Sequence, residues 1–96
     1  MKMTVKARIN WTPVEDGGRK HMLPVGVRYN PLITFEGEQV SEKLWSAEVF
    51  NTVINGRTTE ADVSYLSDDA PFNLLQAGKK FLLYEGQQVV AKGVVL

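Results

Sequence analysis

The chain has 96 residues, of which 44% are hydrophobic and 23% are charged, and eleven basic residues balance eleven acidic ones. This length and composition exclude a disordered chain and indicate one globular domain, residues 1–96, with a single core. The zero net charge argues against a dedicated nucleic-acid-binding protein, since neutralising phosphates supplies much of the affinity of such proteins. Because there is no cysteine, we expect no disulfide, no thiolate metal site and no cysteine nucleophile.

The first predicted element is a strand over residues 3–11, where five apolar residues alternate with polar ones. This period of two indicates a strand with one face in the core and the other in water. Pro13 and the run 15–18 end the strand and predict an exposed loop. A second extended stretch is predicted over residues 22–29, at an edge or a bulge, because Pro24 has no N–H to give to a ladder.

Two turns frame the next short strand. Asn30-Pro31 predicts the first turn, residues 32–35 the strand, and residues 36–38 the second turn. A longer strand is then predicted from an alternating set of inward residues, namely Trp45, Ala47, Val49 and Val53. We expect both tryptophans of the chain, Trp11 and Trp45, to lie in the core.

The last predicted elements are two hairpins separated by a break. Asn55-Gly56 favours a tight turn with positive φ, followed by a return strand over residues 58–65. Residues 67–71 interrupt the chain, and residues 72–75 fit either a single helical turn or a loop. The run 80–96 predicts a terminal hairpin with its turn at Glu85-Gly86.

The rhythm of these elements predicts the fold class. Turns recur about every eight to fifteen residues, and no long window has an apolar period of about 3.6 residues, so no long helix is expected. We predict an all-β domain, a small closed antiparallel β-barrel of about six or seven strands. Closure also removes the exposed edges that an open sheet would present.

Two blocks of sequence resemble a known family. They are the loop Glu15-Asp16-Gly17-Gly18-Arg19-Lys20-His21, followed by Tyr29-Asn30-Pro31, and the terminal run 81–96 with Glu85-Gly86 at its turn. They are similar to the C-terminal β-barrel domain of elongation factor Tu, the translational GTPase that carries aminoacyl-tRNA. Here Lys20 separates the arginine from the histidine, and Gln87 stands where the family has a second glycine.

The resemblance implies a barrel of that kind standing alone, with Glu85 and Gly86 at positions that contact tRNA in the family. The chain has no GxxxxGKS or GxxxxGKT loop, so we expect no nucleotide cofactor. Glu85 and Gly86 also have a purely local explanation, because a hairpin turn accounts for both residues without any ligand.

Two further places are candidate binding sites. Gly18, Arg19, Lys20 and His21 put three basic groups on an exposed loop, where they fit a phosphate or carboxylate. A solvated turn explains the same residues, and three adjacent basic groups are common by chance. Phe50 is out of phase with the inward residues of its strand, which favours an exposed position on the outer face and a partner surface.

Recognisable catalytic parts are missing from the sequence. His21 is the only histidine, the acidic pairs fall in predicted turns, and no serine lies in a GxSxG context. We therefore expect neither an enzyme nor a metal or other cofactor. Because the chain lacks cysteine, a signal-like segment and an apolar run long enough for a bilayer, we also expect a cytoplasmic protein with no membrane partner.

The leading functional hypothesis is a non-catalytic binding or adaptor domain that docks a protein partner through its outer barrel surface. Two alternatives stay open: an RNA-binding module related to translation factors, and a small inhibitor or immunity-type protein.

Overall fold

Seven strands make up almost all of the regular structure. The structure is a computed structural model, and it describes residues 3–21, 23–36 and 44–96. Two single-turn 3-10 helices, η1 (Val14–Asp16) and η2 (Phe72–Leu74), are the only helical elements in these ranges. Of the two alternatives left open for residues 72–75, a helical turn or a loop, η2 is the helical turn. The strands are β1 (Val5–Trp11), β2 (Arg28–Tyr29), β3 (Leu32–Phe35), β4 (Trp45–Asn55), β5 (Thr58–Tyr65), β6 (Lys80–Glu85) and β7 (Gln88–Val95).

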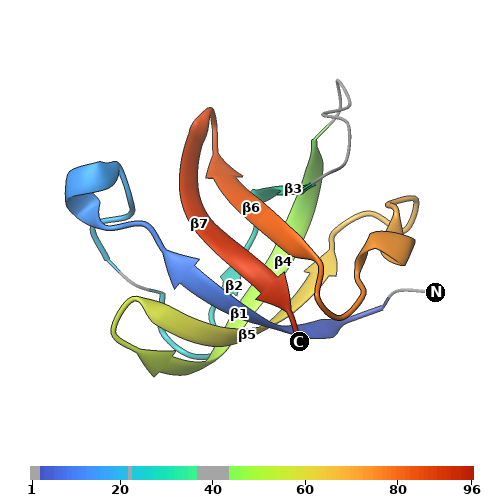
Figure 1. Cartoon of the computed structure of the whole chain (residues 1–96), viewed down its shortest axis with the longest axis horizontal. Coiled ribbons are helices and arrows are strands. Elements are labelled where there is room, and N and C mark those ends of the chain that lie inside the picture. Colours follow the sequence, from blue (N-terminus) through green and yellow to red (C-terminus); the bar gives the residue numbers. More distant parts are fainter. Residues whose placement is uncertain (1–2, 22, 37–43) are drawn as a thin grey trace.

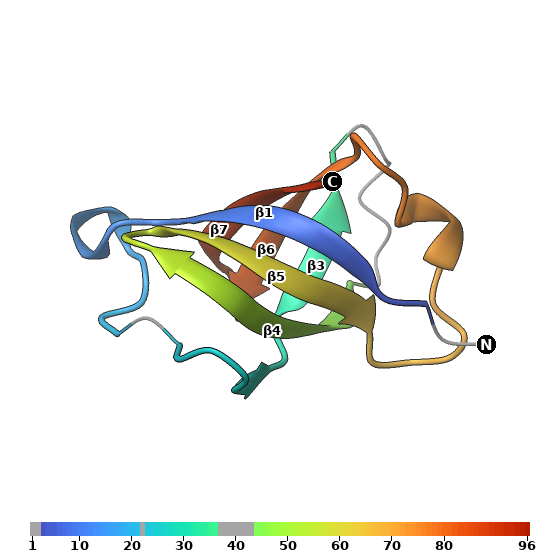
Figure 2. The same ribbon diagram turned by 90° about the horizontal axis from the view of Figure 1, so that it is seen from below.

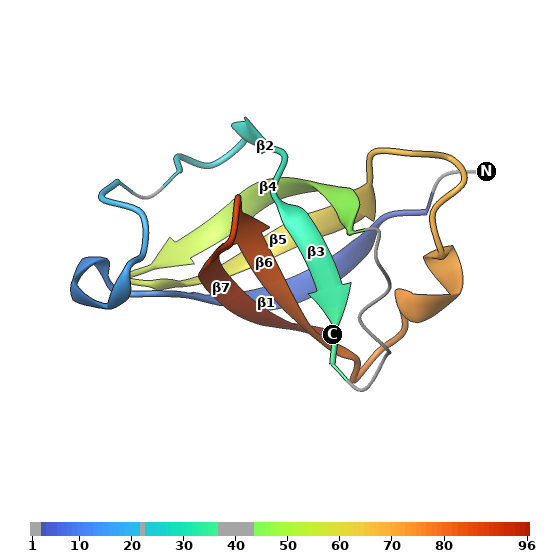
Figure 3. The ribbon, with the colours of Figure 1, turned by 90° about the horizontal axis from the view of Figure 1, so that it is seen from above.

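Six of these strands close into an antiparallel barrel in the order β4-β3-β6-β7-β1-β5, with β5 pairing back onto β4. The short β2 adds a seventh strand on β4 (Figure 1). Figure 2 shows the wall made by β1, β5 and β4, and Figure 3 shows the opposite wall made by β3, β6 and β7. The predicted all-β class and the closed barrel of six or seven strands are confirmed.

The second predicted extended stretch, residues 22–29, is wrong over most of its length. Met22 lies outside the described residues, and the chain makes a turn at Val25-Gly26, where Gly26 has a φ of 81°. The Val27 N–H donates to the Pro24 carbonyl at 3.4 Å across this turn. A glycine with positive φ at the third position is typical of a type II turn, and only Arg28–Tyr29 remain as a strand.

The predicted turn at Asn30-Pro31 is an interruption between two strands that follow the same edge of β4. The Asn30 side-chain amide donates to the Ala47 carbonyl at 3.1 Å, and the Ala47 N–H donates to the Pro31 carbonyl at 2.8 Å. These two hydrogen bonds take the place of the backbone ladder bond that Pro31 cannot donate, because proline has no N–H. The turn predicted at 36–38 lies outside the described residues from Gly37 onward.

Both hairpin turns are one residue later than predicted. Asn55 pairs with Thr58, so the β4–β5 turn consists of Gly56 and Arg57. Glu85 pairs with Gln88 in the same way, which leaves the β6–β7 turn to Gly86 and its successor. The first turn residue is in each case a glycine with positive φ, at 62° for Gly56 and 61° for Gly86. This is the glycine placement of a type II′ turn, one of the two that suit the strand twist.

The barrel interior holds the inward side chains of all six strands. Trp11 is buried, and its Nε1–H donates to Thr59 Oγ1 at 2.9 Å, so its predicted burial is confirmed. Trp45 is only partly buried at the barrel end, with its ring edge-on to Tyr65 at 6.4 Å. The other large core residues, each worth about 1.5–3 kcal/mol of burial, are Ile9, Ile33, Phe35, Val49, Val63, Tyr65, Leu75, Phe81, Leu83, Val90 and Val95.

A bulge in β4 reverses the orientation of its last residues. Asn51 pairs with Ala61, but the next pair is Val53 with Glu60, so Thr52 is the extra residue. Asn51, before the bulge, keeps the inward position of the regular alternation, whereas Val53, which the sequence pattern placed inside, is 52% exposed. The predicted inward set of this strand is wrong at Val53.

Candidate functional site

The basic loop predicted as a binding site owes its path to two glycines. After β1 the chain passes through η1 and turns at Gly17, whose φ is 95°. The Gly18 N–H donates to the Pro13 carbonyl at 2.9 Å. A Cβ at Gly18 would overlap the Thr12 carbonyl, so only glycine lets the loop approach its own start so closely. Gly18 thus shapes the loop and directs the residues that follow it.

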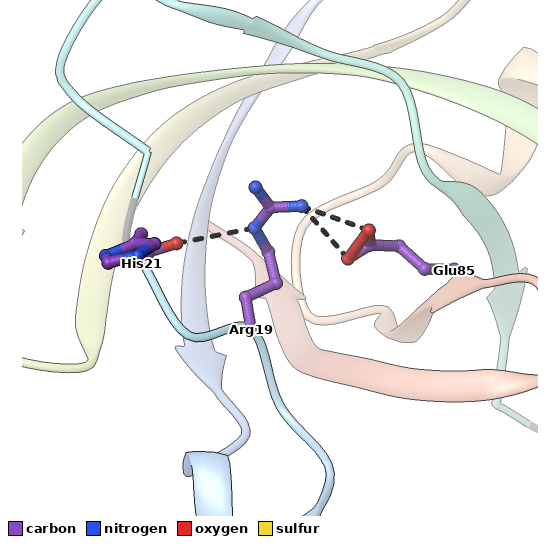
Figure 4. A network of polar contacts seen from close by, with 3 residues as sticks. All are labelled: Arg19, His21 and Glu85. Atoms are coloured by element: carbon purple, nitrogen blue, oxygen red, sulfur yellow. Dashed lines mark hydrogen bonds and ion pairs between the residues drawn. The ribbon is translucent and has the colours of Figure 1, made fainter.

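Arg19 leaves this loop and binds the start of the terminal hairpin turn. Its Nη1 lies 3.0 Å from Glu85 Oε1 and 3.1 Å from Glu85 Oε2, and its Nε donates to the His21 carbonyl at 3.4 Å (Figure 4). The guanidinium carbon lies 5.0 Å from the centre of the Tyr29 ring. The structure therefore joins two candidate sites that are 66 residues apart in sequence.

The Arg19–Glu85 pair is only partly exposed, with 27% of the arginine side chain and 41% of the glutamate side chain accessible. Burial acts to lower the pKa of Arg19, but the hydrogen bond and charge of Glu85 outweigh it and the net shift is upward. Both carboxylate oxygens of Glu85 are committed to this bond. Arg19 therefore acts as a clamp between the loop and β6, a role that neither the anion site nor the solvated turn considered from the sequence includes.

Tyr29 lies beneath this pair. Its hydroxyl is buried and forms no hydrogen bond with the part of the chain that the structure describes. Burial raises the pKa of the Tyr29 phenol, the nearby Glu85 carboxylate adds to the rise, and Arg19 opposes it. The Tyr29 ring also contacts Trp11, with ring centres 5.7 Å apart, which connects the ion pair to the barrel core.

Arg57 is a residue of this site that the sequence analysis did not single out. Its Nη1 donates to the Thr12 carbonyl at 3.2 Å, and its Nη2 donates to the Arg19 carbonyl at 3.1 Å. It lies at the tip of the β4–β5 hairpin and fastens the basic loop from that side. The only sequence signal was its place just after Asn55-Gly56, where a long polar side chain can reach back over the barrel end.

The loop and the hairpin together frame an open recess of about 390 Å³. Lys20 and His21 are exposed on its wall, and within the described residues neither side chain has a hydrogen bond or ion pair. They are the free donors of the site and can bind a carboxylate or phosphate. The whole lining consists of Gly17, Gly18, Arg19, Lys20, His21, Glu85, Gln88 and Val90. Gly86 lies beside the recess in its turn.

Phe50 lies apart from the recess. It faces outward on β4 as expected, between its pairing partners Arg28 and Asp62, but it is only partly exposed. Ion pairs flank it on both sides, Arg28–Glu48 at 3.5 Å and Lys6–Asp62 at 2.7 Å. The predicted outward direction of Phe50 is right, and its side chain is partly exposed on that face.

Exposed aliphatic side chains gather instead at one end of the barrel. The Gly26 N–H donates to the Asn51 carbonyl at 3.1 Å, which holds the turn at 24–27 against β4 just before its exposed residues. We call this region, at the left of Figures 1 to 3, the loop end. Its aliphatic residues are between 39% and 57% exposed and are Val14, Val25, Val27, Val53 and Ile54.

Comparison with protein-family models and with curated proteins gives no match for this chain. Among the described residues no group of three His, Asp or Glu side chains is placed to hold a metal ion. In the same ranges no helix has the length and apolarity needed to cross a membrane. The site is therefore interpreted from its own geometry.

Proposed function

We propose that this protein is a non-catalytic binding or adaptor domain that docks a protein partner at its loop end. The observation that carries this proposal is the group of five exposed aliphatic residues on three segments of that end: η1, the turn at 24–27 and the tip of β4. Exposed apolar side chains on neighbouring segments of a small domain favour an interaction site. A small inhibitor or immunity-type protein would use such a surface in the same way, with an enzyme as its partner.

The polar groups around this surface indicate the partner's chemistry. Lys20 and His21 stand at the recess on the same end, and Arg57 fastens the loop that carries them. An interface with an apolar centre and a polar rim is the usual arrangement of a specific contact. The partner surface that fits is apolar at its centre, with a carboxylate at the rim facing Lys20, where the charge guides orientation more than it adds affinity.

Site-specific photo-crosslinking tests this proposal directly. A benzophenone amino acid at Val53 should crosslink one defined protein in cells, and nuclease treatment should leave the product intact. The same amino acid at Leu66, which is 42% exposed at the end of β5 remote from the β4–β5 tip, is the matched control and should give no product.

The variant Val25→Ser with a crosslinker at Val53 completes the test. It should reduce the crosslinked product strongly while leaving the melting temperature nearly unchanged, because exposed side chains contribute little to folding. Equal products from Val53 and Leu66, or a product that the Val25→Ser change leaves untouched, would refute docking at the loop end.

We further infer a relationship of fold with the C-terminal barrel of elongation factor Tu. The closed six-stranded antiparallel barrel and the meeting of the Gly17–His21 loop with Glu85 support it, because the two resembling blocks form one site. RNA binding through Arg19, Glu85 and Gly86 is the second function that the resemblance implies. Since Arg19 and Glu85 neutralise each other, the recess offers RNA fewer free charges than its sequence suggests.

A further inference from the structure

The charges of the barrel are unevenly distributed although they cancel over the whole chain. Three carboxylates lie on the wall of β4 and β5, namely Glu48, Glu60 and Asp62, and two of these are neutralised by Arg28 and Lys6. The opposite wall carries Lys80 on β6 and Lys92 on β7, and neither strand has a carboxylate before Glu85 at the hairpin turn. A zero net charge therefore conceals a cationic wall.

Three cations converge where this wall meets β1, because of the strand register. Val94 of β7 pairs with Arg8 of β1 on one side and with Lys80 of β6 on the other. Lys92 lies two residues before Val94, so it is the diagonal neighbour of both, at about 7–8 Å between Cα atoms. We call Arg8, Lys92 and Lys80 the cationic strip; a shallow hollow of about 200 Å³ lies between Lys80 and Lys92.

The side chains of the strip are free within the described part of the chain, where none of them forms an ion pair or hydrogen bond. Glu60 pairs across from Arg8 at one border, and Glu36 follows β3 beside Lys80 at the other, yet neither comes within ion-pair distance. The carboxylates therefore bound the strip without neutralising it, and Lys92 at its centre has Asn10 and Leu82 as its pairing partners.

Partly buried apolar groups continue the strip along β6. Leu82 pairs with Lys92, and Tyr84 follows two residues later on the same outward face, beside Leu32 of β3. A row of cations that tracks a backbone, next to an aromatic ring that can stack on a base, is the usual arrangement of a surface for single-stranded nucleic acid. An acidic polypeptide would use the cations equally well but would have no need of the ring.

We propose that the cationic strip binds the phosphate backbone of single-stranded RNA, with Tyr84 as a stacking platform. From Arg8 to Lys80 the strip crosses two β-strand spacings, a distance of about 10 Å. It can therefore contact successive phosphates along one RNA chain, and not only a single phosphate group. None of the three cations of the strip lines the recess or belongs to the loop end, so this proposal does not depend on the protein-docking proposal.

Fluorescence anisotropy with a labelled oligouridine of about 12 nucleotides, within the usual site sizes, tests the proposal. If three phosphates are neutralised, the logarithm of the affinity should fall with the logarithm of salt with a slope of about −2, from roughly −0.7 per phosphate on a single strand. Affinity should then drop about 20-fold between 50 and 200 mM salt. The variant K92Q should reduce the slope by about 0.7, and K92R should restore it.

Two variants distinguish binding at the cationic strip from a general effect of the protein's charge. R28Q removes the same charge from the opposite wall and should leave the salt slope unchanged. Y84L should weaken binding at every salt concentration without changing the slope, since it removes stacking and no charge. Circular dichroism melting confirms that each variant is folded.

Four outcomes would overturn the proposal. The first three are an absence of oligouridine binding by the folded protein at low salt, an equal loss from R28Q and K92Q, and polyglutamate binding with an affinity that matches or exceeds that of oligouridine. Inorganic phosphate that displaces oligouridine at micromolar concentration would also overturn it, because it would show a single-anion site.

Discussion

Gly93 on β7 offers the sharpest test of how the barrel core is packed. It pairs with Phe81 on β6, and a Cβ at this position would overlap the Phe81 ring. The ring has little room to move, because Phe81 is 1% exposed and its centre lies 5.8 Å from that of Phe35. Since Gly93 does not have a positive φ, its backbone would accept alanine, and space alone opposes the change.

The expected magnitude of Gly93→Ala follows from two opposing terms. Overpacking a well-filled core costs about 1–3 kcal/mol, whereas replacing a strand glycine returns about 0.5–1 kcal/mol of backbone entropy. The net destabilisation is roughly 1–2 kcal/mol, which lowers the melting temperature by about 4–16 °C in a domain of this size. Urea unfolding followed by tryptophan fluorescence measures the free energy, and thermal circular dichroism the melting temperature.

A double-mutant cycle assigns the cost to Phe81. Alone, Phe81→Leu removes three buried carbons and should cost roughly 2 kcal/mol at about 0.8 kcal/mol each. In the Gly93→Ala background the same change frees space for the new methyl group, so the double variant should be less destabilised than the sum of the singles. Strict additivity, or a Gly93→Ala variant that is more stable than the wild type, would refute the packing of Phe81 on Gly93.

Three further predictions concern the turn, the buried tryptophan and the tyrosines. Gly86→Val should lower the free energy of unfolding by about 1–3 kcal/mol in urea melts, because a β-branched residue is strained at the φ of 61°; an unchanged midpoint would contradict the turn geometry. Thr59→Val leaves the buried Trp11 Nε1–H without its acceptor and should cost about 1–3 kcal/mol, whereas a neutral result would show that this bond is dispensable. Burial raises the pKa of Tyr65 to about 12 and that of Tyr29 beyond its usual range. Because both tyrosines stay protonated in the folded state above their unfolded pKa near 10, stability should be unaffected below that pH and fall by about 1.4 kcal/mol per pH unit for each tyrosine above it. Tyr29→Phe should make the fall shallower in urea melts at pH 10 to 12, and an unchanged slope would contradict the shift.

The fold was largely predictable because most of its strands alternate apolar and polar residues with a period of two. Burial alternates along β1 and along most of β5 and β6 as the sequence indicated, and every predicted hairpin turn contains the glycine that the structure uses. The prediction was wrong where one extra residue shifts the alternation of inward and outward side chains. The extra residue Thr52 moves Val53 to the surface, and no sequence signal distinguishes such a bulge from a regular strand.

The candidate site was predicted residue by residue but not as one unit. Gly17 to His21 and Glu85 were each singled out, yet only the closed barrel brings Arg19 within 3.0 Å of Glu85 and makes them partners. The cationic strip could not be foreseen either, since Arg8, Lys80 and Lys92 are dispersed in sequence and meet through the register of β1, β6 and β7. Net charge does not register such segregation, so the argument from zero net charge against nucleic acid binding stays a prediction, which the oligouridine experiment tests.

The two proposed surfaces make a further prediction when they are considered together. Val53 lies at the tip of the β4–β5 hairpin, whereas the strip crosses the three adjacent strands β1, β7 and β6, whose central strand β7 is opposite β4 in the strand order. Sites that share no residues and are joined by one rigid core should behave additively. Oligouridine at saturating concentration should therefore leave the Val53 crosslink intact, and K92Q should weaken RNA binding without changing the crosslink yield. An adaptor requires this independence, because it must hold both ligands at once; competition between them would instead mean that one surface serves both.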